Sequence, residues 1–190
     1  MTIAGGAPAG RRACYVPVRI FAYPELLVVP LVIIMAVLSG CRGASAPGTP
    51  LDAAQAGAVK EEVRRMASDI ARDLAQGGPG AWLRYFDDSE AFFMASDGEL
   101  KFESFASAES YLGDFASGVE SMAIAWEDLR IDPVSAEMAV MAASYQELIN
   151  ETSGSQLAFG GYLTALAVKT PSGWRLRHLH WSSEPPAAGE

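Results

Sequence analysis

The residues best suited to chemistry are two histidines, His178 and His180, near the C-terminal end of the chain. In a β-strand, side chains two residues apart lie on the same face of the sheet. An imidazole titrates near neutral pH, so the pair could act as general acid and general base in a proton transfer. The same H-x-H spacing could hold a metal ion. In a third interpretation, both rings hydrogen-bond to neighbours at the mouth of a pocket.

The composition of the chain narrows these three interpretations. A metal site needs a third ligand, but the chain has only these two histidines, and no carboxylate can be assigned to complete the site. Residues 77–80 (GGPG) lack the Lys and Ser/Thr of a phosphate-binding loop, and no G-x-S-x-G element occurs. We therefore expect no metal and no other cofactor. For His178 and His180 we favour a structural or ligand-contacting role over catalysis.

Carboxylates are the other candidates for acid–base chemistry. Asp97 precedes Gly98, a pair that strongly indicates a two-residue hairpin turn, so we assign Asp97 to the turn. Asp128 follows the alternation of Trp126 and is a second candidate, near the end of its strand. The remaining acidic pairs indicate a solvated surface: Glu61-Glu62, Asp87-Asp88 and Glu127-Asp128.

Aromatic side chains suggest a second kind of site, an apolar ligand pocket. Large aromatic residues pack in a core more often than they bind a ligand, so each candidate has both interpretations. Tyr145 alternates with small residues, which could leave space for a ligand or fit closely against a helix. The candidate pocket residues are Trp82, Trp126, Tyr145, Trp174, His178 and His180.

The composition and net charge of the chain exclude several classes of protein. The chain has 190 residues, of which 50% are hydrophobic and 19% charged, enough apolar material for one folded domain with extensions. The formal net charge of −9 argues against a nucleic-acid partner. Two cysteines cannot form a disulfide-rich scaffold.

The N-terminal region predicts where the protein is located. Residues 26–38 (LLVVPLVIIMAVL) are an uncharged apolar run of signal-peptide length, too short to span a bilayer, with three arginines before it. Residues 38–41 (LSGC) resemble the bacterial lipobox, in which cleavage precedes a cysteine that carries lipid. We therefore expect a signal peptide over residues 1–40. Lipid on Cys41 would be the membrane contact, in the bacterial cell envelope on the periplasmic or extracellular face.

The mature chain divides into three parts. Residues 41–50 are a flexible tether, residues 51–183 the folded domain, and residues 184–190 a polar, Pro-containing tail. A capping box at Asp52 and Gln55 starts a helix over residues 52–76, and residues 77–80 end it. One apolar stripe follows this helix: Val59, Val63, Met66, Ile70 and Leu74.

The rest of the domain combines short helices with long strands. We expect helical segments over residues 81–86 and 105–115, and a hairpin of residues 92–94 and 100–102. Turns are expected at residues 132–133, 150–154 and 171–173. They would connect strands over residues 122–131, 137–149, 156–170 and 174–182. Helices followed by an antiparallel meander predict an α+β fold.

Strict alternation along the last strand assigns its two faces. Trp174 and Leu176 mark the inner face, and alternation extends it to His178, His180 and Ser182. Arg175, Arg177, Leu179 and Trp181 would then lie on the outer face. This assignment places both histidines in or beside a cavity.

The arrangement resembles the nuclear transport factor 2-like superfamily and, within it, the SnoaL-like proteins. The resemblance rests on the long first helix, the short helix with Trp82, the hairpin at residues 97–98, and the terminal strands at residues 161–164 and 173–182. It implies a cystatin-like fold: a cone-shaped, curved antiparallel sheet wrapped around the N-terminal helix. It also implies a cavity and, in many members, a homodimer through the sheet.

The resemblance leaves the activity open, because members include isomerases, dehydratases, hydrolases, polyketide cyclases and proteins that only bind or assemble. With no assigned catalytic base, we expect a domain that binds a small apolar molecule or supports assembly. The alternative is a cavity enzyme that performs proton-transfer chemistry through His178 and His180.

Overall fold

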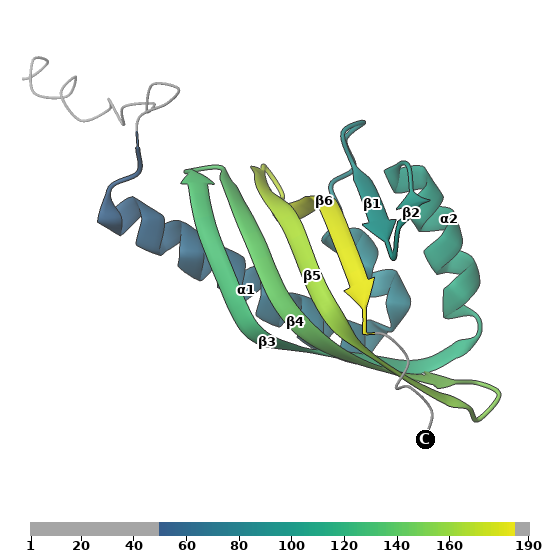
Figure 1. Cartoon of the computed structure of the whole chain (residues 1–190). Coiled ribbons are helices and arrows are strands. Elements are labelled where there is room, and N and C mark those ends of the chain that lie inside the picture. The colour runs from purple at the N-terminus through teal and green to yellow at the C-terminus, as the bar shows by residue number, and fades with distance from the viewer. Residues whose placement is uncertain (1–49, 185–190) are drawn as a thin grey trace, which may run out of the picture. The chain divides into compact units, whose positions relative to one another are not determined.

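The computed structural model describes residues 50–184, in which a long helix packs against one face of a curved six-stranded sheet (Figure 1). The helical elements are α1 (Ala53–Gly77), the 3₁₀ helix η2 (Pro79–Arg84) and α2 (Phe105–Ala116). The strands are β1 (Phe93–Ser96), β2 (Glu99–Phe102), β3 (Val119–Ser135), β4 (Met138–Glu151), β5 (Gln156–Thr170) and β6 (Gly173–Ser183). Their order in the sheet is β2-β1-β6-β5-β4-β3, antiparallel except for the parallel pair β1–β6. The α+β prediction, with a curved sheet around the N-terminal helix, is confirmed.

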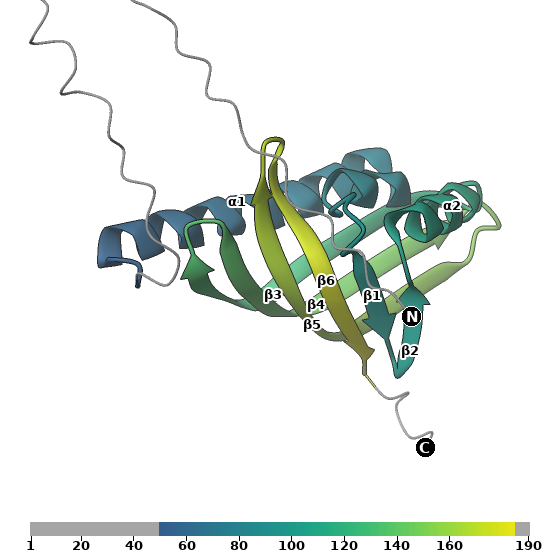
Figure 2. The same ribbon diagram turned by 90° about the horizontal axis from the view of Figure 1, so that it is seen from above.

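Helix α1 forms where the sequence predicts it. The Asp52 carboxylate accepts a hydrogen bond from the backbone N–H of Gln55 at 2.8 Å, and the Gln55 side chain accepts one from the N–H of Asp52 in return. Gly78, at φ 66°, ends the helix in a conformation that favours glycine. The whole predicted stripe is buried against the sheet, and Figure 2 shows α1 running along one side of the strands. The helix therefore closes one half of the core.

The β1–β2 hairpin turns at Asp97 and Gly98, with φ 51° and 88°. Two positive φ angles are those of a type I′ turn, which matches the twist of a hairpin. The Asp97 carboxylate accepts hydrogen bonds from the backbone N–H of Ser183 at 2.7 Å and from its hydroxyl at 3.0 Å. These bonds hold the pKa of Asp97 below its usual value. Asp97 thus forms the turn, as predicted, and also fixes the end of β6.

The turn predicted at Asp132-Pro133 is wrong. Both residues continue β3, where they pair with Val140 and Ala139 of β4, and the chain reverses only after Ser135. Proline lacks an N–H donor, so a Pro in a sheet is confined to edge strands, strand ends and bulges. β3 is the outermost strand of this sheet, and the pairing shifts register between Pro133 and Ser135. An edge position therefore makes Pro133 compatible with a strand.

Two β-bulges break the alternation on which the predicted faces depended. In β3 the register shifts between Glu127 and Arg130, Asp128 has φ 50°, and its side chain is exposed. Leu129 and Ile131 pack against the core instead. The bulge turns the carboxylate of Asp128 outward, so the inward placement predicted from its parity with Trp126 is wrong.

The second bulge lies in β6. Ala167 of β5 pairs with Leu176, whereas its neighbour Leu166 pairs with His178, so Arg177 is the extra residue. Beyond the bulge, Leu179 and Trp181 are buried on the same side as Leu176. The predicted faces of β6 are therefore wrong after residue 176: His178, His180 and Ser182 lie on the outer face.

An ion pair holds this bulge. The Arg177 Nε donates to Asp87 Oδ2 at 2.5 Å, and Asp87, only 2% exposed, is the one buried charged residue in the described part of the chain. The Asp87 backbone N–H donates to the Leu176 carbonyl at 2.9 Å. Burial raises the pKa of Asp87, but hydrogen bonds from Ser89 and Arg177 outweigh it and leave the pKa below its ordinary value. The expectation of a solvated surface at Asp87 is wrong.

Arg177→Met should destabilise the domain by about 3 kcal/mol at pH 7, because it leaves the Asp87 carboxylate buried and unpaired. Without the guanidinium, burial should raise the folded-state pKa of Asp87, so the loss should shrink as the pH falls towards 4. Urea denaturation at the two pH values measures both effects. The double variant Asp87→Asn/Arg177→Met should recover much of the stability at pH 7. An equal loss in the single and double variants would contradict this role for the pair.

Candidate active or binding cavity

A cavity of about 330 Å³ opens at the end of the sheet where β4 finishes and β5 begins. None of its lining residues comes from α1; α2 covers it instead with Tyr111, Leu112 and Phe115. Most of the wall is apolar and much of it is aromatic: Trp82, Phe86, Phe102, Tyr111, Phe115, Tyr145, Phe159 and Trp181. A site of this size and composition suits a small, largely apolar molecule.

Contacts between rings fix one side of the wall. Trp82 stacks on Phe86 with centroids 5.6 Å apart and meets Trp181 edge-on at 5.7 Å. Tyr145 meets Trp181 edge-on at 4.6 Å. Such pairs stabilise beyond their buried area and restrict ring motion. The wall is therefore held in place without a ligand.

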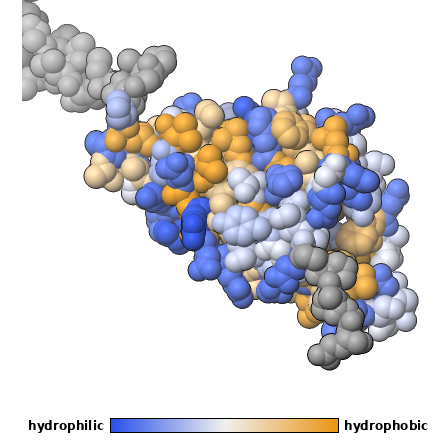
Figure 3. All heavy atoms as spheres, in the orientation of Figure 1, coloured by the Kyte–Doolittle hydropathy of each residue, from blue (hydrophilic) through white to orange (hydrophobic). Residues whose placement is uncertain are grey.

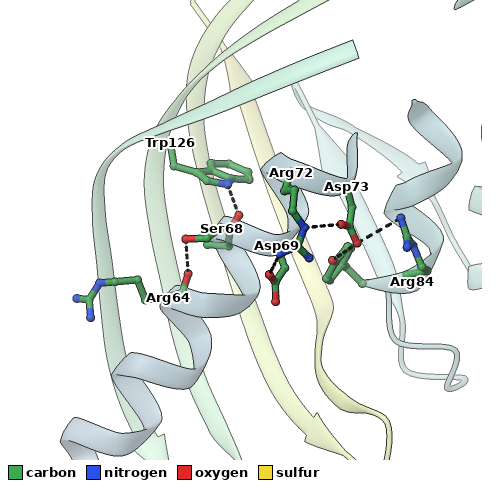
Figure 4. A network of polar contacts seen from close by, with 9 residues as sticks. Arg64, Ser68, Asp69, Arg72, Asp73, Arg84 and Trp126 are labelled. Atoms are coloured by element: carbon green, nitrogen blue, oxygen red, sulfur yellow. Dashed lines mark hydrogen bonds and ion pairs between the residues drawn. The ribbon is translucent and has the colours of Figure 1, made fainter. Parts of the chain in front are cut away.

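Helix α1 supports this wall from behind. The Trp126 indole Nε1 donates to the Ala67 carbonyl at 2.9 Å (Figure 4). The Trp126 ring meets Trp82 edge-on at 6.4 Å. Asp73 accepts a hydrogen bond from the Tyr85 hydroxyl at 2.6 Å and pairs with Arg84 at 3.3 Å. Burial and this hydrogen bond raise the pKa of Tyr85 to about 12. These contacts attach η2, with Trp82, to α1.

Of the six predicted pocket residues, Trp82 and Tyr145 line the cavity. Trp126 lies behind the wall. Trp174 is buried elsewhere, where its Nε1 donates to Glu62 at 2.7 Å. Glu62 also pairs with Lys169 at 2.7 Å, so Glu62 belongs to a bonded cluster rather than to a purely solvated surface.

The two histidines lie outside the cavity. The His178 ring stacks on Phe93 of β1 at 4.4 Å on the outer face, and His180 is exposed beside it. Within residues 50–184, no group of three His, Cys, Asp or Glu side chains is arranged to hold a metal ion. Cys41, the predicted lipidation site, lies outside the described residues.

Glu147 is the residue of the site that the sequence analysis missed. Its half-buried side chain lines the cavity from β4, on the same face as Tyr145 and Ile149. It makes no hydrogen bond or ion pair with any other described residue, and burial raises its pKa to about 7. The signal was present in the sequence: Glu147 continues the alternation of Ala139, Met141, Ala143 and Tyr145 and is the one acid in that series.

Glycine at position 161 allows the strands beside the site to approach closely. A Cβ at Gly161 would overlap the Ser182 carbonyl oxygen and would lie 3.0 Å from the Tyr145 hydroxyl. Only glycine therefore fits between β6 and the Tyr145 side chain. Burial also raises the pKa of Tyr145, which keeps its hydroxyl protonated. The cavity thus has a phenol donor and a titratable carboxyl on one strand.

The raised pKa of Glu147 has a consequence for stability. The folded state holds the proton at a pKa of about 7, against an ordinary value of 4.5, so the protein should lose stability as the pH rises from 4.5 to about 7 and should lose no more from this group above that pH. Glu147→Gln cannot ionise and should be more stable than the wild type by about 1–2 kcal/mol at pH 8, allowing for the partial exposure of this carboxyl. At pH 4 the two proteins should be equally stable.

Urea denaturation at pH 4 and pH 8 measures this difference. Glu137→Gln is the matched control, because Glu137 is exposed in the β3–β4 turn and should change stability little at either pH. A stability difference for Glu147→Gln that is the same at both pH values would contradict the assignment.

The sequence matches the model of the SnoaL-like domain family over residues 62–188. The chain belongs to this family, and its fold is that of the nuclear transport factor 2-like superfamily. No curated protein matches the sequence. No helix in the described residues is long and apolar enough to cross a membrane.

Solved structures show the same fold at low sequence identity. A nuclear transport factor 2-like superfamily protein from Salmonella enterica serovar Typhimurium LT2 is 18% identical, with a TM-score of 0.57, over 70% of this chain and 97% of that one. A conserved protein from Planctomyces limnophilus DSM 3776 is 14% identical, with a TM-score of 0.56, over 68% and 98%. A hexachlorocyclohexane dehydrochlorinase (LinA, type 2) is 14% identical, with a TM-score of 0.54, over 70% and 91%. These similarities concern the fold alone.

Proposed function

We propose that the protein is a lipid-anchored component of the bacterial envelope whose SnoaL-like domain binds a small, predominantly apolar molecule. The main support for the binding role is the cavity beneath α2. Its aromatic walls are already packed, so a ligand would not have to order them. Apolar area removed from water stabilises a complex by about 25 cal/mol per Å², and the wall offers mainly such area.

A neutral probe, 4-phenylbutan-1-ol, tests the binding role by isothermal titration calorimetry. We expect saturable binding that Leu157→Asp weakens at least tenfold, because Leu157 lines the cavity and the new carboxylate would be poorly solvated there. Leu100→Asp is the matched control, since Leu100 is 61% exposed and does not line the cavity. Equal weakening by both variants would place the binding elsewhere.

The proposed envelope location is supported by the apolar run at residues 26–38 and by Cys41 shortly after it. In a bacterial host, Cys41→Ser should abolish incorporation of a palmitate label and leave the precursor unprocessed. Western blotting and metabolic labelling measure both results. A variant that keeps the wild-type size and the acyl label would show that Cys41 carries no lipid.

A second copy of the chain is the partner we propose for the outer face of the sheet. In Figure 3, which has the orientation of Figure 1, apolar residues gather over the upper part of this face. Three of the exposed apolar side chains are Val134, Met138 and Val140, at 58%, 36% and 36% exposure. A gathering of exposed apolar side chains on one face is typical of an association site.

Light scattering tests the dimer. The wild-type domain should have twice the mass of a single chain, and Val140→Lys should halve it, because a lysine would be desolvated in the interface. Leu100→Lys is the control, since Leu100 is exposed on β2 at the other edge of the sheet. A wild-type domain that is monomeric at micromolar concentration would contradict the dimer.

Glu147 favours a second candidate, a cavity enzyme that transfers protons. A carboxyl with a pKa of about 7 can both give and take a proton at neutral pH, and it lies in an apolar cavity beside Tyr145. The structure does not support proton transfer through His178 and His180, because both imidazoles lie on the outer face of the sheet. Turnover that follows a single ionisation near pH 7 and is lost in Glu147→Gln would favour the enzyme.

A further inference from the structure

The carboxyl of Glu147 lies in an apolar wall without a positive partner. Ile124 and Phe159, which pair with Glu147 on the neighbouring strands, are both apolar. Burial raises the pKa of Glu147, and no described residue forms an ion pair or hydrogen bond with its carboxyl. An uncompensated acid in such a place costs stability unless something else supplies the charge.

The other ionisable groups around the cavity do not supply that charge. Lys101 of β2 is the one basic residue among those that line it, and its Nζ lies over the ring of Tyr111, 4.6 Å from the centroid, with no ion pair to Glu147. Tyr145 on β4 and Tyr111 on α2 are neutral phenols. From the hairpin and the end of β6, Asp97 and Glu184 add to the negative field that Glu147 exerts on Tyr145. Glu147 therefore has no ion-pair partner among the residues that line the cavity.

The walls also suit a cation. Aromatic faces attract ammonium groups, and the attraction grows when the cation is desolvated. The chain itself shows such contacts in two places, Lys101 over Tyr111 and Lys169 over Trp174 at 5.8 Å. Tyr111, Trp82 and Trp181 all line the cavity that contains Glu147.

We propose that the ligand is an organic ammonium ion on an apolar body, with the Glu147 carboxylate as its counter-ion and the aromatic rings around the body. This inference rests on the proposed binding function and adds the chemical class of the ligand. The cation would provide the charge that the described residues lack, and the carboxylate would exclude anionic compounds of the same shape.

Three probes of matched shape test the proposal: 4-phenylbutylamine, 4-phenylbutan-1-ol and 4-phenylbutyrate. Titration calorimetry of the protein at pH 7 should show 4-phenylbutylamine binding at least tenfold more tightly than 4-phenylbutan-1-ol. It should show no measurable binding of 4-phenylbutyrate. Repeating the amine titration in two buffers of different ionisation enthalpy should show release of roughly half a proton, because pairing with the amine ionises Glu147.

Glu147→Gln should remove the advantage of the amine and keep the affinity for the alcohol. Binding of the alcohol also reports that the variant has kept its cavity. Glu137→Gln, which removes the same charge far from the lining residues, should behave as the wild type with all three probes.

The other outcomes separate this inference from the function on which it rests. If the alcohol and amine bind equally, the ligand class is wrong and the binding function stands. If the alcohol binds more tightly than the amine, and more tightly still at pH 6, Glu147 acts as a neutral hydrogen-bond donor and the ammonium proposal is overturned. If none of the probes binds, the proposed binding function fails, and this inference fails with it.

Discussion

The ion pair between Arg177 and Asp87 decides what the last strand presents to the cavity. A strand of regular alternation would direct both histidines inward and Trp181 outward. The extra residue at Arg177 reverses the faces beyond that point, so that Trp181 and Ser183 line the cavity. The bulge persists because Arg177 reaches a carboxylate that is 2% exposed, while the backbone of residues 85–87 bonds to Leu176 on both sides. A charged contact between segments 90 residues apart therefore sets the chemistry of the site.

The cavity forms because α1 does not cover the whole inner face of the sheet. The apolar stripe of α1 packs on the sheet along β3, while the end of the sheet near Glu147 is covered by α2 and by Trp82 of η2. The hydrogen bonds of Asp73 and Trp126 attach the aromatic wall to α1. The packed helix α1 therefore positions the residues that line the cavity. Rigid support of this kind allows a site to be preorganised without being filled.

The sequence predicted what local patterns determine. The capping box at Asp52, the stripe on α1, the Asp97-Gly98 turn and β5 over Gln156–Thr170 all appear in the structure, because each depends on residues a few positions apart. The orientation of His178 and Asp128 could not be predicted in the same way. Each follows a bulge, and each bulge depends on backbone geometry or on a distant partner that alternation does not encode. The error at Pro133 has a similar origin, since only the strand order shows that β3 is an edge.

Glu147 lowers the stability of the domain at neutral pH, so its presence needs an explanation other than stability. A leucine or isoleucine in its place would continue the apolar face of β4 and would avoid the cost of an ionisable group in the wall. Asp87, the buried acid of the described residues, accepts hydrogen bonds from Ser89 and Arg177 at Oδ2, which shows that this fold can pair a buried carboxylate where the role is structural. Glu147 has no such partner among the described residues, and it lies in the wall of the cavity. Groups with strongly shifted pKa values in a cavity tend to serve binding or chemistry, and the contrast between these two acids is the reason that we propose Glu147 as the functional group of the cavity.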